Sequence, residues 1–187
     1  RFIVEEELAR AGTSVLLMAY TNRAVDELCA MLDDAGIDYL RIGNEYSADP
    51  RCEPHLLGEA VKACPRLDAM KERIRSVRVI TGTTSMLVSR PFISDIKHFT
   101  LAVVDEASQI LEPNIVGLLA AHRTDGSGRQ ACCIDKFVLT GDHKQLPAVV
   151  QQDAGESEIS SRQLRDICLD DCRDSLFERL LRVERNA

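Results

Sequence analysis

The sequence predicts an α/β fold with a parallel sheet flanked by helices, because short apolar runs alternate with segments of helical spacing. Four runs have the composition of buried strands: residues 15–19, 77–80, 101–104 and 137–139. Each run leads into Thr, Gly, Asp, Asn or Gln. Since the carboxyl ends of parallel strands meet at one edge of a sheet, these residues are expected to form one polar edge.

The first half of the chain predicts a helix, a strand and a second helix in succession. The helix over residues 1–10 is expected to end at Gly12, because Gly commonly terminates helices. The strand over residues 15–19 is followed by Thr21 and Asn22, which are good N-cap residues for the next helix. A further short strand is expected at residues 39–42.

Residues 44–76 predict a short inserted segment. Its first part contains three prolines and is expected to be irregular, with at most one short helix over residues 45–65. Leu67, Met70 and Ile74 then have the spacing of a helix.

The second half predicts three further helices and two polar loops. The first helix is expected at residues 112–121, the second after Ser160 or Ser161 with Ile167 and Cys168 among its apolar residues, and the third from Leu176 onward. The loops are expected at residues 123–130 and 151–161.

Composition limits the classes of function. The chain has 187 residues, 45% of them apolar and 28% charged, which fits one globular domain. The net charge of −7 argues against a free-standing nucleic-acid binder, so strong binding would need other domains. The one basic cluster lies around residues 66–78, where a solvated helix face is favoured over a nucleic-acid contact.

The seven cysteines form no C-x-x-C pair, so no zinc site is predicted. Reduced, mostly buried thiols are expected instead, as in a cytoplasmic protein. No stretch has the length and apolarity of a membrane span, so no membrane partner is expected.

Two adjacent carboxylates, Asp105 and Glu106, follow the third apolar run. An Asp at a strand end can hold Mg²⁺, and a neighbouring Glu can orient or deprotonate a water that attacks a phosphate. Taken alone, this pair favours a strand that ends in a solvated acidic turn.

Taken together, four stretches resemble motifs Ia, Ic, II and III of superfamily 1 helicases, in the branch of the nonsense-mediated-decay helicase and senataxin. They are residues 15–28, 77–85, 101–109 and 137–147, and they occur in the family's order. The resemblance covers almost the whole chain. It implies that residues 1–187 form part of the first of two RecA-like ATPase domains, in a helicase that uses ATP and translocates 5′ to 3′.

The resemblance assigns roles to the acidic and amide residues. Asp105 matches the Mg²⁺-associated carboxylate, and Glu106 matches the residue that activates water. Gln145 matches a residue that touches the γ-phosphate and helps couple hydrolysis to nucleic-acid movement. Asp142 is expected to bridge to metal-bound waters, whereas His143 is expected to be a plain loop residue.

The resemblance also places nucleic-acid contacts after the first two apolar runs. Thr21, Asn22, Thr83 and Thr84 match positions that meet the backbone of single-stranded DNA or RNA. The same residue types cap helices, so capping remains an alternative role for them.

One departure from the family affects the whole interpretation. No segment resembles G-x-x-x-x-G-K-[ST], the P-loop that cradles phosphates. We therefore expect a fragment that is inactive by itself, with the P-loop strand missing beside residues 137–140. That open edge is expected to favour self-association, or disorder near residues 141–145.

Two functions of other classes remain open. One is a non-catalytic interaction module that has kept the fold, and the other is a nucleotide-dependent switch without translocation. Asp105, Glu106 and Gln145 favour the helicase, because a catalytically inactive domain would not need these residues for hydrolysis.

Overall fold

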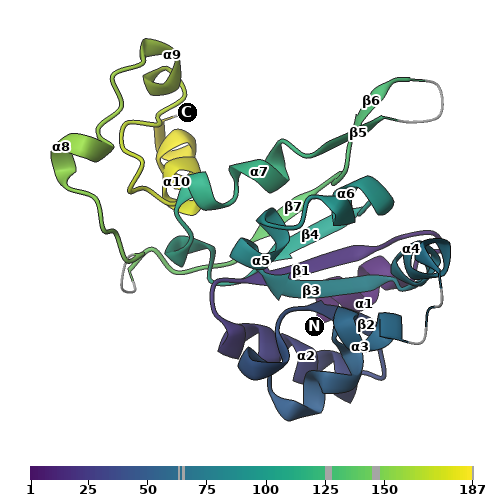
Figure 1. The fold of residues 1–187 in the computed structure, drawn as a ribbon. Coiled ribbons are helices and arrows are strands. Elements are labelled where there is room, and N and C mark those ends of the chain that lie inside the picture. The colour runs from purple at the N-terminus through teal and green to yellow at the C-terminus, as the bar shows by residue number, and fades with distance from the viewer. Residues whose placement is uncertain (63, 65, 125–127, 145–147, 187) are drawn as a thin grey trace.

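The computed structural model describes residues 1–62, 64, 66–124, 128–144 and 148–186. Its centre is a five-stranded parallel sheet with the strand order β2-β3-β1-β4-β7 (Figure 1). The strands are β1 (Val15–Ala19), β2 (Tyr39–Ile42), β3 (Val79–Thr83), β4 (Leu101–Val104) and β7 (Phe137–Leu139). The predicted α/β class and parallel sheet are thus confirmed, and both are consistent with a RecA-like domain.

The pairing register brings the carboxyl ends of the strands to one level. Ala19 at the end of β1 lies opposite Thr83 at the end of β3. On the other side of β1, Met18 pairs with Val104, which in turn pairs with Leu139 of β7. The residues that follow these strands therefore meet at one edge of the sheet.

The central strand is apolar throughout because both of its faces are covered. Leu16 and Met18 pack into the core on one face, whereas Val15, Leu17 and Ala19 pack into the core on the other. This alternation is the period of two that a strand imposes on its side chains. All five residues are fully buried, which explains the near-continuous apolar run in the sequence.

Helices cover the two faces of the sheet (Figure 1). Helices α1 (Phe2–Leu8) and α2 (Asn22–Asp34) pack on one face through Val4 and Val25. The opposite face is covered by α4 (Leu67–Ser76), α5 (Thr84–Val88), α6 (Phe92–Ile96), α7 (Val116–Leu119) and α10 (Leu176–Asn186). None of the helices that the structure describes is long and apolar enough to cross a membrane.

The inserted segment is more regular than the sequence predicts. It contains the 3-10 helices η1 (Glu45–Ser47) and η2 (Pro50–His55) and the helix α3 (Leu57–Lys62). Side chains start the two 3-10 helices: Asn44 accepts a hydrogen bond from the Tyr46 amide, and Asp49 accepts one from the Arg51 amide. The prolines are tolerated because they lie in short helices rather than in a long α-helix.

The segment after the carboxylates differs from the prediction in two places. The helix expected at residues 112–121 is divided into η4 (Glu112–Asn114) and α7. The predicted loop at 123–130 is wrong at its ends, where β5 (His122–Thr124) pairs antiparallel with β6 (Gln130–Cys132). The Asp-Gly pair between these strands is a hairpin signal that the loop prediction overlooked.

The C-terminal region contains two very short helices before α10. They are α8 (Ala154–Ser157) and α9 (Arg162–Arg165). Helix α9 is shorter than predicted because Cys168 adopts a left-handed backbone conformation with φ of 61°. The amide of Leu169 then donates to the carbonyl of Leu164 at 3.0 Å, which closes the end of the helix.

Candidate active site at the carboxyl edge of the sheet

Asp105 is held in place by both neighbouring strands. Its backbone amide donates to the Met18 carbonyl of β1 at 2.7 Å. Its carboxylate oxygen Oδ1 accepts hydrogen bonds from the Thr140 hydroxyl at 2.7 Å and from the Glu106 amide at 3.0 Å. The carboxylate is half-buried and cannot turn freely, so it has a defined position at the end of β4.

Glu106 has an unusual backbone conformation. Its φ of 51° and ψ of 39° place it in the left-handed region, which residues other than glycine seldom adopt. Such a conformation costs about 1–3 kcal/mol and is often found at functional sites. The chain turns sharply here into the 3-10 helix η3 (Ala107–Gln109), and the half-buried Glu106 lies at the turn.

The loop after β7 packs directly against η3. The Ala107 amide donates to the Thr140 carbonyl at 2.7 Å. A Cβ atom on Gly141 would lie 2.9 Å from the Ser108 amide nitrogen and 3.2 Å from the Ser108 hydroxyl oxygen. Only glycine permits this approach without a shift of the backbone, so Gly141 couples the β7 loop to the carboxylate loop.

The last helix anchors the segment that follows η3. Arg179 of α10 donates through Nε and Nη2 to the two carboxylate oxygens of Glu112, at 2.6 and 2.7 Å. Both side chains are largely buried, and the hydrogen bonds to Glu112 raise the pKa of Arg179. Ser175 and Glu178 form a reciprocal capping box at the start of α10, which fixes the helix that carries Arg179.

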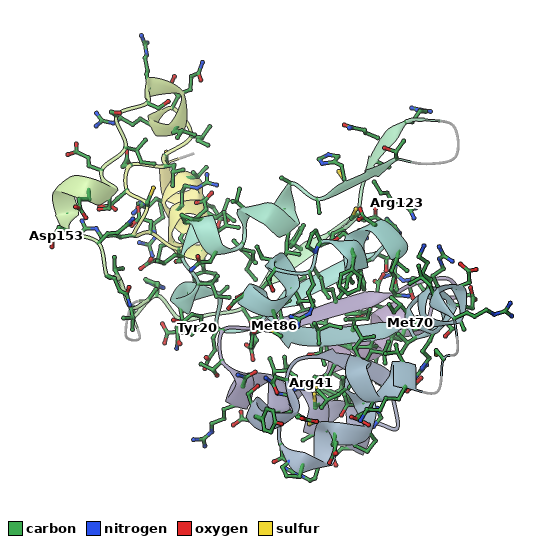
Figure 2. The ribbon with its side chains drawn as sticks, viewed as in Figure 1. Tyr20, Arg41, Met70, Met86, Arg123 and Asp153 are labelled. Carbon is green, nitrogen blue, oxygen red and sulfur yellow. The ribbon has the colours of Figure 1, made fainter. Side chains whose placement is uncertain are left out.

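The predicted nucleic-acid residues lie at the same edge but differ in exposure. Thr21 and Asn22 are exposed, and the Thr21 hydroxyl accepts the Ala24 amide at 3.1 Å as the N-cap of α2. Thr83 is mostly buried and caps α5 by accepting the Met86 amide at 3.3 Å. Thr84 is only 1% exposed. Figure 2 shows Tyr20 and Met86 close to this edge.

The remaining predicted residues follow β7. Asp142 is exposed and accepts the Lys144 amide at 2.9 Å, which makes a local turn. His143 is an exposed loop residue, as predicted, 3.5 Å from Nη2 of Arg185. Gln145 lies outside the described residues. The structure therefore brings Asp105 and Glu106 together with Thr140, while Asp142 is placed in the adjoining loop.

Asp105 has the donor chemistry that a hard cation requires. Both of its side-chain hydrogen bonds within the described residues involve Oδ1, which leaves Oδ2 as a carboxylate ligand. In the part of the chain that the structure describes, no three His, Cys, Asp or Glu side chains form a complete metal site. Mg²⁺ typically uses one or two carboxylates and completes its shell with water and substrate phosphates.

Sequence reasoning did not assign roles to Thr140 or Gly141. Both belong to the stretch that resembles motif III, where the predicted site residues are Asp142 and Gln145. A polar residue at the end of the strand beside the carboxylates was the available signal for Thr140. The sequence also predicts the capping box, because Ser175 and Glu178 have the spacing S-x-x-E.

Comparison with known proteins identifies the family of the chain. Residues 66–153 match the model of a family described as an AAA domain. The chain is 34% identical over 181 residues to the DNA replication ATP-dependent helicase/nuclease DNA2 of Xenopus laevis, covering 96% of the chain and 14% of that protein. It is 34% identical over 144 residues to the Homo sapiens DNA2, covering 76% of the chain and 12% of the relative.

A plant relative gives the same result. The DNA replication ATP-dependent helicase/nuclease JHS1 of Arabidopsis thaliana is 33% identical over 140 residues, covering 75% of the chain and 9% of that protein. The chain thus spans about a seventh or less of the length of these relatives. All three are replication helicase/nucleases, and the finer placement beside the nonsense-mediated-decay helicase and senataxin stays a prediction.

Proposed function

This chain is a segment of a superfamily 1 helicase, and we propose that its sheet edge supplies residues for ATP hydrolysis in a protein that moves along single-stranded nucleic acid. The observation that carries the proposal is the fixed carboxylate of Asp105 at the end of β4, which Glu106 follows directly. Asp105 is bonded to the Thr140 hydroxyl of the neighbouring strand, and Glu106 is held beside it by a left-handed turn. Parallel sheets bind their ligands at this edge.

In the proposed mechanism the two carboxylates have separate tasks. Asp105 would hold the Mg²⁺ of Mg-ATP, and a bound ion would supply the positive charge that offsets the phosphates. Glu106 orients the attacking water and accepts its proton as a general base. The left-handed turn fixes the backbone of Glu106 directly after Asp105, and its amide donates to Asp105 Oδ1.

The β7 loop is suited to report the state of the nucleotide. Gly141 packs against the backbone of η3, so a movement at the carboxylates passes directly to the segment that continues into Asp142 and Gln145. We propose that Gln145 contacts the γ-phosphate and that Asp142 would accept hydrogen bonds from the water around a bound Mg²⁺ ion. The close packing of the two loops supports this coupling, as does the motif in which both residues lie.

The proposed nucleic-acid path runs over the ends of β1 and β3. Thr21 and Asn22 are exposed there and can offer donors to a phosphate backbone without reading sequence. Thr83 and Thr84 would first have to become accessible, since both are buried.

We also propose that the parent protein contains the second RecA-like domain and that it acts in the cytoplasm or in another reducing compartment.

The relatives' names contain the words DNA replication, and on that ground we propose single-stranded DNA as the substrate rather than RNA. The test is the ATPase rate of the full-length parent, measured without nucleic acid, with single-stranded DNA and with single-stranded RNA of the same sequence. Stimulation by DNA alone is expected. An ATPase that neither strand stimulates would contradict a translocating motor and favour a nucleotide-dependent switch.

A further inference from the structure

A basic pocket of about 420 Å³ lies at the opposite edge of the sheet, near the amino ends of β1, β3 and β4. The cations Arg75, Arg78, Lys97 and Arg123 contribute to its wall, and none of the described residues that line it is acidic. His98 also lines it and lies 2.8 Å from the carboxylate of Asp135. Figure 2 shows Arg123 far from Tyr20, at the other end of the sheet. In a chain of net charge −7, such a group of cations is unexpected.

Lys97 is the most deeply placed of these cations. It is 7% exposed, and its Nζ donates to the Arg75 carbonyl at 2.9 Å. An ammonium group has three donors, so this bond leaves two without a hydrogen-bond acceptor among the described residues, although the group also lies 5.9 Å from the centroid of the Phe99 ring. Within the described residues Lys97 has no carboxylate partner, and a buried charge without one is costly. Burial, followed by the charge of Arg78, lowers the pKa of Lys97 to about 8, which keeps it largely protonated at neutral pH.

Of the three arginines in the wall, one builds the pocket and the other two have unused donors. Arg78 donates to the carbonyls of Leu8 and Thr13, at 2.7 and 3.0 Å, and so fixes the loop before β1. The Nε atom of Arg123 is buried with no hydrogen-bond partner among the described residues. Arg75 makes only a 3.9 Å exposed ion pair with Glu72, and such pairs contribute little.

We propose that this pocket binds a phosphate group, with Lys97, Arg75 and Arg123 as its donors. A phosphate has several acceptor oxygens and up to two negative charges, so it can accept from donors that line the pocket from three different segments. The volume falls in the ordinary range of small-ligand sites. The pocket and the carboxylates lie at opposite edges of the sheet, so this phosphate is distinct from the one that is hydrolysed.

The choice of probes distinguishes two sources of the phosphate group, which are free phosphate and the 5′ end of a nucleic-acid strand. Binding is measured on the full-length protein with inorganic phosphate, with a single-stranded oligonucleotide bearing a 5′-phosphate, and with the same oligonucleotide bearing a 5′-hydroxyl. Each titration is repeated with Lys97→Met and Arg123→Gln. Lys71→Met is the matched control, because Lys71 is on α4 but does not line the pocket.

We expect Lys97→Met and Arg123→Gln each to weaken binding of at least one phosphate probe about tenfold or more, since a hydrogen bond to a charged group contributes about 1.5–3 kcal/mol. Lys71→Met should leave it unchanged. A loss confined to inorganic phosphate identifies a free phosphate as the ligand, and a loss confined to the 5′-phosphorylated strand identifies a nucleic-acid end. Equal affinities of wild type, Arg123→Gln and Lys71→Met for all probes would overturn the proposal, even if Lys97→Met did not fold.

Discussion

The hydroxyl of Thr140 donates a 2.7 Å hydrogen bond to Oδ1 of Asp105 and so joins the end of β7 to the carboxylate at the end of β4. This bond connects two stretches that are 35 residues apart in the chain. It fixes one carboxylate oxygen and leaves the other for a cation. The site is therefore built from two strands rather than from one acidic turn.

Replacing this hydroxyl tests its role. Thr140→Val keeps the shape of the side chain but removes the donor, so Asp105 loses a charge-assisted bond of about 1.5–3 kcal/mol. We expect the parent's ATPase turnover to fall at least tenfold and its apparent Mg²⁺ requirement to rise. Thr140→Ser retains the hydroxyl and serves as the control. Equal Mg²⁺ dependence in all three proteins would exclude a positioning role for Thr140.

Gly141→Ala tests the contact between the two loops. The new Cβ would lie 2.9 Å from the Ser108 amide nitrogen, a backbone atom that cannot move aside cheaply. We expect the free energy of unfolding, measured with urea, to fall by about 1–3 kcal/mol, as in other overpacked sites.

Gly58→Ala is the matched control, because a Cβ atom added to Gly58 in α3 would meet nothing within 4 Å. An alanine in a helix should be neutral or slightly stabilising there, by up to about 1 kcal/mol. If both substitutions had the same effect, the close approach of Gly141 would have no energetic consequence.

Gln145→Ala tests coupling in the parent protein. Gln145 follows the loop that packs on η3, and its amide can both donate to and accept from a phosphate. We expect the stimulation of ATPase by single-stranded DNA to decrease several-fold while nucleotide affinity changes little. A change in affinity alone would assign Gln145 to binding rather than to coupling.

The 187-residue chain by itself is expected to hydrolyse no measurable ATP. Its sequence contains no P-loop, so no lysine and no glycine-rich turn hold the triphosphate for attack. Robust Mg²⁺-dependent hydrolysis by this chain would refute the requirement for the P-loop.

The edge of the sheet at β7 predicts self-association of the chain. Within the described residues β7 pairs only with β4, which leaves backbone groups available for another strand. Light scattering should then show concentration-dependent self-association.

The sequence was sufficient for the sheet because its strands contain short, mostly apolar runs, of which the central one is buried on both faces. Val15–Ala19 has this pattern, and the positions of Asp105 and Thr21 at the strand ends follow from it. Local signals likewise predicted α2 and α10. These features depend on neighbouring residues in the chain, which a single sequence displays directly.

The remaining features depend on contacts between distant segments. The bond from Thr140 to Asp105, the approach of Gly141 to Ser108 and the burial of Thr84 all require the packed sheet. The basic residues around position 75 were interpreted as a solvated helix face, because nothing local indicates that Lys97 and Arg123 join them in one pocket.

The measurement that tests the central claim most directly is the ATPase turnover of the full-length parent with Glu106→Gln. The substitution keeps the shape of the side chain and removes the general base, whose contribution is typically ~10²–10⁴-fold. We predict a fall of that size with nucleotide binding retained. An unchanged turnover number would contradict the account, because the carboxylate held beside Asp105 would then have no part in hydrolysis.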